Sequence, residues 1–428
     1  MPFKRSLYVL LVSSLALLYS CNDKFSSSLF KPQTPHQKYE QKLKDGGLAN
    51  TVLYKQWINA AERSLIEPLA IDIPYLEQGY FADNSPGAAG YVFEALNGEQ
   101  LQITFALQSV DSTQLFVDLF QAAADTSDQH KHLQSADKGD TSLIYNISKD
   151  GKYVLRIQAE LLSRVSYELR ITAEASLGNP VANDANQNIG SFFGDGREAG
   201  RRKHEGIDIF AARSTPAVAA ADGVISRVGT NNLGGKIIFL RPRDRSINLY
   251  YAHLDSQLVT TGQAIHIGDT IGLIGNTGNA RTTPPHLHFG IYASGGAVDP
   301  LPFIRPGKSR PPRILSDLKL LGDTIRVASK QKDVAANTPA TVEAATQNGY
   351  RIILPDGRKT FVLQKATTAN LRPLRTLTLA TPGHIYHQPN QLAAVVKKLP
   401  ERTRLTIIGE YDQYHLIEHE GTIGWLAR

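Results

Sequence analysis

Four histidines and one aspartate between positions 204 and 288 have residue types and spacings that suit a metal site. His204 and Asp208 lie four residues apart around a glycine in HEGID, and His286 and His288 lie two residues apart in HLH. Alternate residues of a strand share one face, so both imidazoles of HLH should point to the same side. Two histidines and one carboxylate are a recurrent ligand set of catalytic zinc, because three protein ligands leave the fourth tetrahedral position for water.

The remaining histidine of the five residues, His253 in YYAHL, adds a proton-transfer group. Zinc lowers the pKa of its bound water toward about 7, and a positioned imidazole that takes or gives a proton contributes about 10²–10⁴-fold in rate. The sequence contains no HExxH helix with its glutamate base. Any general base must therefore be one of the histidines, and the spacing does not show which.

Four motifs of this region occur in the order typical of the LytM or lysostaphin-type zinc endopeptidases, which residues 190–305 resemble. The motifs are HEGIDI, STPAVAAADGVI, YYAHLDSQLVTTGQAIHIGDTIGLIGNTGNA, and PPHLHFGIY with a closing VDP. The resemblance implies an antiparallel β-sheet with a groove. It also implies cleavage of peptide cross-links in peptidoglycan.

The same resemblance implies a role for each residue of the cluster. It assigns the zinc ligands to His204, Asp208 and His288, and proton transfer to His253 and His286. The expected cofactor is one Zn²⁺ ion. We therefore expect a zinc metalloendopeptidase, with a non-catalytic regulator or activator of other wall hydrolases, or mainly a wall-anchoring protein, as the alternatives.

The segment before His204 departs from the family pattern. No tyrosine stands between Phe193 and His204, where some relatives place one that helps to hold the oxyanion. A residue of this segment that donated a fourth zinc ligand would hold the enzyme latent. We interpret the basic residues of the segment as a solvated loop rather than a substrate clamp: Arg197, Arg201, Arg202 and Lys203.

The N-terminus has the pattern of a lipoprotein signal peptide over residues 1–20. Two basic residues precede an apolar run that is too short to span a bilayer core of roughly 30 Å. The run ends in Leu18-Tyr19-Ser20-Cys21, which resembles a bacterial lipobox, and Cys21 is the only cysteine of the chain. We expect a lipidated Cys21 that anchors an exported protein to a membrane of the cell envelope, and no intramolecular disulfide.

The rest of the chain is expected to be mainly β. We predict a flexible tether over 21–47, a helix plus a jelly-roll-like β-sandwich similar to bacterial pre-peptidase domains over 48–176, and the LytM-type core over 190–305. Alternating strands flank Asn97-Gly98 and Asp150-Gly151 and predict a hairpin at each pair.

The C-terminal part contains a repeat. Tyr350 aligns with Tyr414 and Gly357 with Gly421, which keeps polar, apolar and turn positions in phase. Residues 376–428 resemble bacterial SH3-like domains and residues 320–368 a diverged copy, so we expect tandem small SH3-like β-barrels. The resemblance implies binding of cell-wall peptide, and the alternative is a structural appendage.

The net charge is +6, and the basic residues are interspersed with acidic ones instead of forming a basic cluster. This pattern does not indicate nucleic-acid binding. The expected partners are peptidoglycan peptides and, through the lipid anchor, a membrane. The sequence leaves open the oligomeric state. It also leaves open the bond that is cut: a D-alanyl to diaminopimelate cross-link is expected in a diderm host, and glycyl bridges are the alternative.

Overall fold

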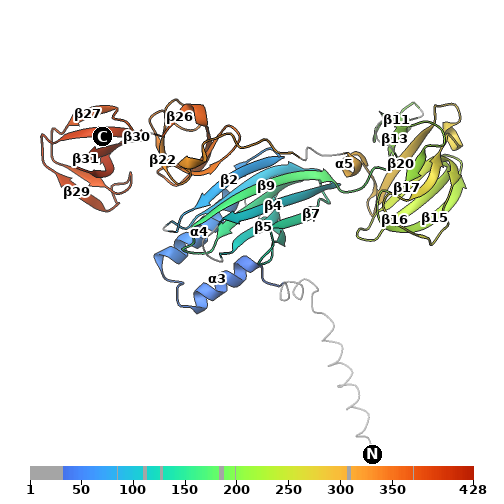
Figure 1. The fold of residues 1–428 in the computed structure, drawn as a ribbon, viewed down its shortest axis with the longest axis horizontal. Coiled ribbons are helices and arrows are strands. Elements are labelled where there is room, and N and C mark those ends of the chain that lie inside the picture. The colour runs from blue at the N-terminus through green and yellow to red at the C-terminus, as the bar shows by residue number, and fades with distance from the viewer. Residues whose placement is uncertain are drawn as a thin grey trace, which may run out of the picture.

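A computed structural model describes residues 32–428, apart from residues 84, 109–112, 126–128, 183–187, 198, 306–309 and 370. Antiparallel sheets build most of it, so the mainly β class predicted from the sequence is confirmed (Figure 1). A central β-sandwich carries residues 188–304 at one end and the C-terminal sheets at the other. The predicted signal peptide and Cys21 lie outside the described residues. None of the described helices is long and apolar enough to cross a membrane.

The sandwich packs two sheets around one apolar core. The first sheet has the order β1 (Leu69–Ala70), β3 (Ala88–Ala95), β8 (Gly151–Ala159), β5 (Leu115–Gln121) and β6 (Lys131–Ser135). The second contains β2 (Tyr75–Phe81), β9 (Val165–Ala175), β4 (Glu99–Gln108) and β7 (Ser142–Asn146). Apolar side chains alternate along β4, where Leu101, Ile103 and Phe105 are buried between the sheets.

The two predicted hairpins are wrong. The chain leaves β3 in the first sheet, turns at Gly98 and enters β4 in the second, and it crosses between the sheets again from β7 through Gly151 to β8. Both glycines have positive φ, so the turns were located correctly. A turn signal marks where the chain reverses, whereas the partner of each strand is decided by packing in the jelly-roll-like sandwich.

The predicted tether over 21–47 is also wrong from residue 35 onward, where α3 (Pro35–Asp45) begins. Thr34 caps this helix: its hydroxyl accepts from the Gln37 backbone N–H at 3.2 Å, and the Gln37 side chain accepts from the Thr34 N–H at 3.0 Å. The helix predicted within residues 48–176 is present at the start of that range as α4 (Val52–Ile66). The polar composition concealed the capping signal of α3.

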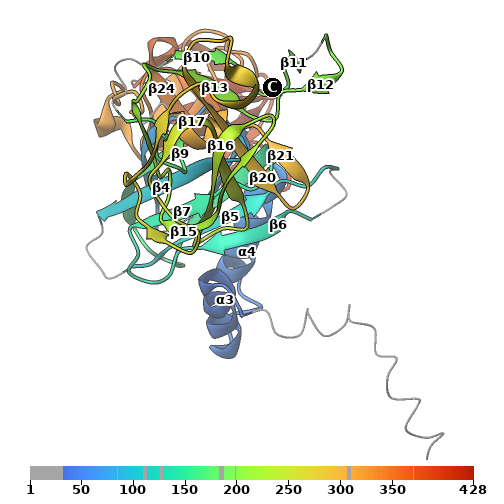
Figure 2. The ribbon, with the colours of Figure 1, turned by 90° about the vertical axis from the view of Figure 1, so that its right-hand side faces the viewer.

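Both helices cover the outer face of the first sheet (Figure 2). His36 and Leu43 of α3 are buried with Trp57 of α4 and Phe116 of β5. The His36 ring stacks on Trp57 with a centroid distance of 4.5 Å, and its Nε2 donates to the Gln158 side-chain oxygen at 2.7 Å. His36 and Leu43 are seven positions apart, about two helical turns, which places both on one face of the helix.

His36 makes the stability of this face depend on pH. Burial, with the nearby Arg156 charge, lowers the pKa of His36 to about 4, from 6.5 in an unfolded chain. Between these values the unfolded chain binds a proton that the folded protein excludes, so the free energy of unfolding falls as the pH falls, by about 3 kcal/mol in total. The measurement is urea unfolding at about pH 7 and about pH 4.5, followed by Trp57 fluorescence in a Trp425→Phe background.

His36→Phe is the control, because it keeps an aromatic ring against Trp57 and cannot titrate. The pH dependence of unfolding should be shallower in this variant. Equal pH dependence in both proteins would contradict the assignment to His36.

Residues 188–298 form a ten-stranded sheet that curls around its own core. Its main path is β10 (Asn188–Ser191), β13 (Ile207–Phe210), β20 (His286–Ala293), β17 (Asn248–Gln257), β16 (Gly235–Pro242), β15 (Gly223–Asn231) and β18 (Ala264–Ile265). The strands off this path are β14 (Pro216–Val218), β19 (Thr270–Ile274) and β21 (Gly296–Val298). A hairpin and two short helices complete the region: β11 (Gly196–Arg197), β12 (Arg202–Lys203), η2 (Gly278–Ala280) and α5 (Leu301–Ile304).

The first C-terminal unit continues the second sheet of the sandwich. Its elements are η3 (Leu318–Leu320), β22 (Thr324–Val327), β23 (Pro339–Ala345), β24 (Gly349–Ile353), β25 (Lys359–Leu363), η4 (Gln364–Ala366) and β26 (Thr367–Thr368). Strand β23 pairs antiparallel with β2, where Gln78 lies opposite Ala345 and Gly79 opposite Ala344. One nine-stranded sheet therefore spans the sandwich and this unit.

The last unit has a separate six-stranded sheet. Its strands are β27 (Arg375–Thr378), β28 (Gly383–Tyr386), β29 (Val395–Leu399), β30 (Arg404–Tyr411), β31 (Tyr414–His419) and β32 (Thr422–Ala427). The aligned repeat segments form hairpins, β24–β25 and β31–β32, with Gly357 and Gly421 both at positive φ in the turns. The SH3-like assignment of the two units stays a prediction.

Candidate active site

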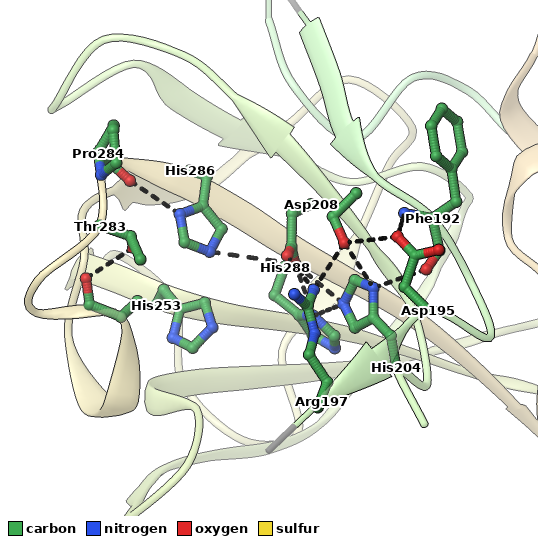
Figure 3. Close-up of polar contacts among 12 residues, drawn as sticks. Phe192, Asp195, Arg197, His204, Asp208, His253, Thr283, Pro284, His286 and His288 are labelled. Atoms are coloured by element: carbon green, nitrogen blue, oxygen red, sulfur yellow. Dashed lines mark hydrogen bonds and ion pairs between the residues drawn. The ribbon is translucent and has the colours of Figure 1, made fainter. Parts of the chain in front are cut away.

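Three side chains from two neighbouring strands and the segment before them bring metal-binding atoms together (Figure 3). His204 Nε2 lies 2.9 Å from His288 Nδ1, and Asp208 Oδ1 lies 3.0 Å from each of these nitrogens. All three residues are largely buried. In the described part of the chain, these three form the one group of histidine, cysteine and acidic residues placed to hold a metal ion.

The donor set fits zinc. Zinc binds imidazole nitrogen and carboxylate oxygen at about 2.0–2.2 Å, so two ligand atoms of one ion are at most about 4 Å apart. The observed separations of 2.9–3.0 Å satisfy this limit. Two nitrogens and one oxygen from the protein are also the composition of a catalytic zinc site, which keeps a position for water.

The sheet explains why these residues meet. Asp208 in β13 lies directly opposite His288 in β20, so their side chains share one face. On β20, His286 and His288 both line the groove, whereas Leu287 and Phe289 point into the core. A Cβ on Gly206 would lie 2.5 Å from the Phe289 carbonyl oxygen and 2.8 Å from the His288 ring. The glycine of HEGID therefore lets the chain pass closely under the His288 ring.

A bulge in β17 turns His253 toward the same groove. His253 has a φ of +62°, which is uncommon outside glycine, while its N–H donates to the Gly234 carbonyl and its own carbonyl accepts from Gly275. Strict alternation would place His253 on the core side with Tyr251. Because the bulge adds one residue to the strand, Leu254 instead of His253 points into the core, where it is fully buried. His253 stays on the groove side.

Both histidines outside the ligand triad have one ring nitrogen fixed by a backbone carbonyl. His253 Nδ1 lies 2.9 Å from the Thr277 oxygen, and His286 Nδ1 lies 2.9 Å from the Pro284 oxygen. A carbonyl only accepts, so each Nδ1 carries the hydrogen and each neutral ring keeps a lone pair on Nε2. The rings lie 4.9 Å apart between centroids. Burial, with the neighbouring His286 and His288, lowers the pKa of His253 to about 4, which keeps its ring neutral near pH 7.

Hydrogen bonds also set the protonation of the ligand triad. His204 Nδ1 donates to the Phe192 carbonyl at 2.9 Å, which leaves Nε2 free to bind a metal. Burial alone would raise the pKa of Asp208, but its contacts with His204 and His288 hold that pKa well below its usual range. Burial lowers the pKa of His288. Asp208 is therefore an ionised carboxylate beside the two ligand histidines, which is the form of the carboxyl group that binds a metal ion.

Arg197 corrects the sequence interpretation of a solvated loop. Its Nη2 donates to Asp208 Oδ2 at 2.6 Å and to the Ser191 hydroxyl at 2.7 Å. Among the described residues no fourth histidine, cysteine or acidic ligand joins the triad, and Arg197 reaches Asp208 from the preceding segment as a cation. Nothing in the sequence spacing distinguishes Arg197 from its basic neighbours. The contact with Asp208 is seen only in the folded structure, where Arg197 lies in the hairpin of β11 and β12.

A groove of about 770 Å³ contains all five histidine and aspartate residues. Three of the aromatic side chains that line it form a cluster: Phe239, Tyr250 and Tyr292, with Tyr250 4.7 Å from Phe239 and 6.0 Å from Tyr292 between ring centroids. The Tyr292 hydroxyl donates to Glu205 at 3.2 Å. The sequence analysis did not single out these residues, and the aromatic pair in YYAHL was the available signal.

Comparisons with known proteins concern this region. Residues 202–300 match the family model described as Peptidase family M23. The L-Ala–D-Glu endopeptidase of Bacillus subtilis is 38% identical over 127 residues, which cover 27% of this chain and 39% of that protein. The peptidoglycan DD-endopeptidase ShyC of Vibrio cholerae is 38% identical over 94 residues, 22% of this chain and 21% of that protein.

Among solved structures, the catalytic domain of the antimicrobial peptidase lysostaphin from Staphylococcus simulans is 33% identical. The match covers 27% of this chain and 91% of that chain, with a TM-score of 0.25. The chain spans less than half the length of the two curated relatives, so the similarity concerns one domain. The matched segment contains both HEGID and HLH. Residues 202–300 of this chain are therefore a domain of peptidase family M23.

Proposed function

We propose that this protein is a zinc-dependent endopeptidase that hydrolyses peptide cross-links of peptidoglycan. The observation that carries the proposal is the convergence of a two-nitrogen, one-oxygen ligand triad and two histidines with free Nε2 atoms in one groove. Two relatives support the proposal: one is named as a peptidoglycan DD-endopeptidase and the other as an L-Ala–D-Glu endopeptidase.

The proposed ligands are His204, Asp208 and His288. When bound there, zinc supplies Lewis-acid chemistry: it polarises a peptide carbonyl and makes a water molecule more acidic. His253 and His286 manage the protons. One accepts the proton of the attacking water at Nε2 and, now protonated there, can give that proton to the leaving amine; the other can donate a hydrogen bond to the oxyanion only when its Nε2 also carries a proton. Their fixed Nδ1–H groups keep both Nε2 atoms directed into the groove.

The lining of the groove suits a peptide. Its aromatic side chains next to the triad offer apolar contact to a peptide backbone and short side chains. We further propose that lipidated Cys21 holds the exported protein at a membrane of the cell envelope, and that residues 376–428 bind wall peptides. Both proposals rest on the sequence patterns given above.

The test is mass spectrometry of purified cross-linked peptidoglycan incubated with zinc-loaded residues 22–428. We expect new uncross-linked peptides from the wild type and none from His204→Ala, because two protein ligands hold zinc poorly. His266→Ala is the matched control, since His266 is 75% exposed and lies outside the groove. Intact cross-links in the presence of the wild-type protein, with zinc confirmed bound, would favour a non-catalytic regulator.

A further inference from the structure

We propose that Arg197 is a positioning residue of the metal site: it holds one carboxylate oxygen of Asp208, so that the other oxygen alone faces the two ligand histidines. This inference rests on the proposed function, because it concerns the same ligand triad. It adds a residue that does not touch the reacting atoms and that acts through Asp208.

The two oxygens of Asp208 have separate partners (Figure 3). Oδ2 accepts from Arg197 Nη2 at 2.6 Å, and Oδ1 lies 3.0 Å from His204 Nε2 and from His288 Nδ1. The Asp208 side chain is only 10% exposed, so the charge-assisted bond is formed with little competition from water. A carboxylate can bind a metal through one oxygen or through both. The guanidinium occupies Oδ2 and thereby selects binding through Oδ1.

Arg197 is itself held in place by a second contact. Ser191 lies beside Asp208 in the pairing of β10 with β13, and its hydroxyl accepts from Arg197 at 2.7 Å. The same hydroxyl donates to Asp195 at 3.1 Å and lies 3.2 Å from His204 Nδ1. One hydrogen-bonded chain therefore runs behind two of the three proposed ligands, from the His204 ring to the Asp208 carboxylate.

The sign of the effect on zinc affinity separates positioning from simple charge. A cation near a metal site repels the metal, so removal of its charge alone should tighten zinc binding. Loss of a partner that orients a ligand has the opposite effect, and such losses weaken metal binding by about 10–100-fold. Positioning by Arg197 therefore predicts weaker zinc binding when the positive charge is removed.

The experiment compares zinc dissociation constants of the full chain and its variants by competition with a chromophoric chelator, without substrate. We expect Arg197→Gln to bind zinc about 10–100-fold more weakly, Arg197→Lys to fall between Gln and wild type, and Ser191→Ala to weaken binding less than Arg197→Gln. Arg227→Gln is the matched control, because Arg227 lines the same groove and, among the described residues, forms no hydrogen bond or ion pair with the triad. Its zinc affinity should be unchanged or higher.

A second readout follows the coordination itself. The visible absorption of the Co²⁺-loaded protein depends on the coordination number, and we expect it to weaken in Arg197→Gln as both Asp208 oxygens become available. Fold integrity is checked on the metal-free variants by thermal unfolding, which should remain a single cooperative transition although the variant loses its bond to Asp208.

Zinc affinity of Arg197→Gln equal to or higher than that of the wild type, with an unchanged cobalt spectrum, would overturn the inference. This failure is distinct from failure of the proposed function. A wild-type protein that binds zinc but does not cleave peptidoglycan contradicts the endopeptidase, whereas the affinity comparison does not depend on turnover.

Discussion

His286→Ala is expected to reduce the rate of peptidoglycan cross-link cleavage by about 10²–10⁴-fold while zinc remains bound. His286 Nε2 lies 4.0 Å from Asp208 Oδ1, close to the triad but outside it. Its Nδ1–H donates to the Pro284 carbonyl, which leaves Nε2 as the proton acceptor of the ring. The variant removes this acceptor. The measurement is the initial rate of product formation by mass spectrometry, with zinc content determined on the same samples.

The double variant His253→Ala/His286→Ala sharpens this test. The two rings lie 4.9 Å apart and are proposed to serve one reaction, so their losses should not multiply. Cleavage by His286→Ala at the wild-type rate would remove His286 from the mechanism. A drop in rate that follows loss of zinc would instead make it a residue that supports metal binding.

The motifs HEGID and HLH indicated which residues would lie together, because both act through local geometry, whereas the roles given to these residues stay predictions. HLH puts two imidazoles on one strand face, and Asp208 meets His288 through strand pairing. The placement of His253 was not predictable in the same way. A period of two assigns it to the core side with Tyr251, and only the bulge, with the positive φ of His253, brings it into the groove.

Contacts between distant segments account for the features that the sequence concealed. Arg197 looks like its basic neighbours until β10 places Ser191 beside Asp208. The turns at Gly98 and Gly151 look like hairpin turns in the sequence. A turn residue shows where the chain reverses, but it does not show which sheet the next strand joins. Helix α3 has a capping signal, but its burial depends on the outer face of a sheet formed by later residues.

The joint between the sandwich and the first C-terminal unit is the largest example of such a contact. Beyond the pairing of β23 with β2, a buried ionic network crosses it. Arg351 of β24 has no exposed surface and donates to Glu343, to Glu77 at 3.2 Å and to the Tyr167 hydroxyl at 2.7 Å. Tandem modules would be expected to move independently of the sandwich, whereas this network makes the sandwich and residues 324–368 one structural unit.

Arg351→Met is therefore expected to lower the free energy of unfolding of the sandwich by about 3–5 kcal/mol, although the substitution lies in the C-terminal unit. The variant leaves the carboxylate of Glu77, which is fully buried, without its cation, and the hydroxyls of Tyr75, Tyr91 and Tyr167 then satisfy it only by hydrogen bonds. The measurement is urea unfolding followed by Trp57 fluorescence in the Trp425→Phe background, because Trp57 packs against the sandwich.

Arg358→Met is the matched control. Arg358 lies in the turn between β24 and β25, seven positions after Arg351. Its side chain is 54% exposed and pairs with the neighbouring Asp356, so its loss should lower the free energy of unfolding by less than about 1 kcal/mol. The double variant Glu77→Gln/Arg351→Met should recover part of the stability, because it removes the charge that Arg351→Met leaves unpaired. If Arg351→Met shifted the Trp57 transition no more than Arg358→Met, the two units would be stabilised independently. The edge pairing of β23 with β2 would then be a contact between separate domains, and the position of the C-terminal unit would not depend on the network.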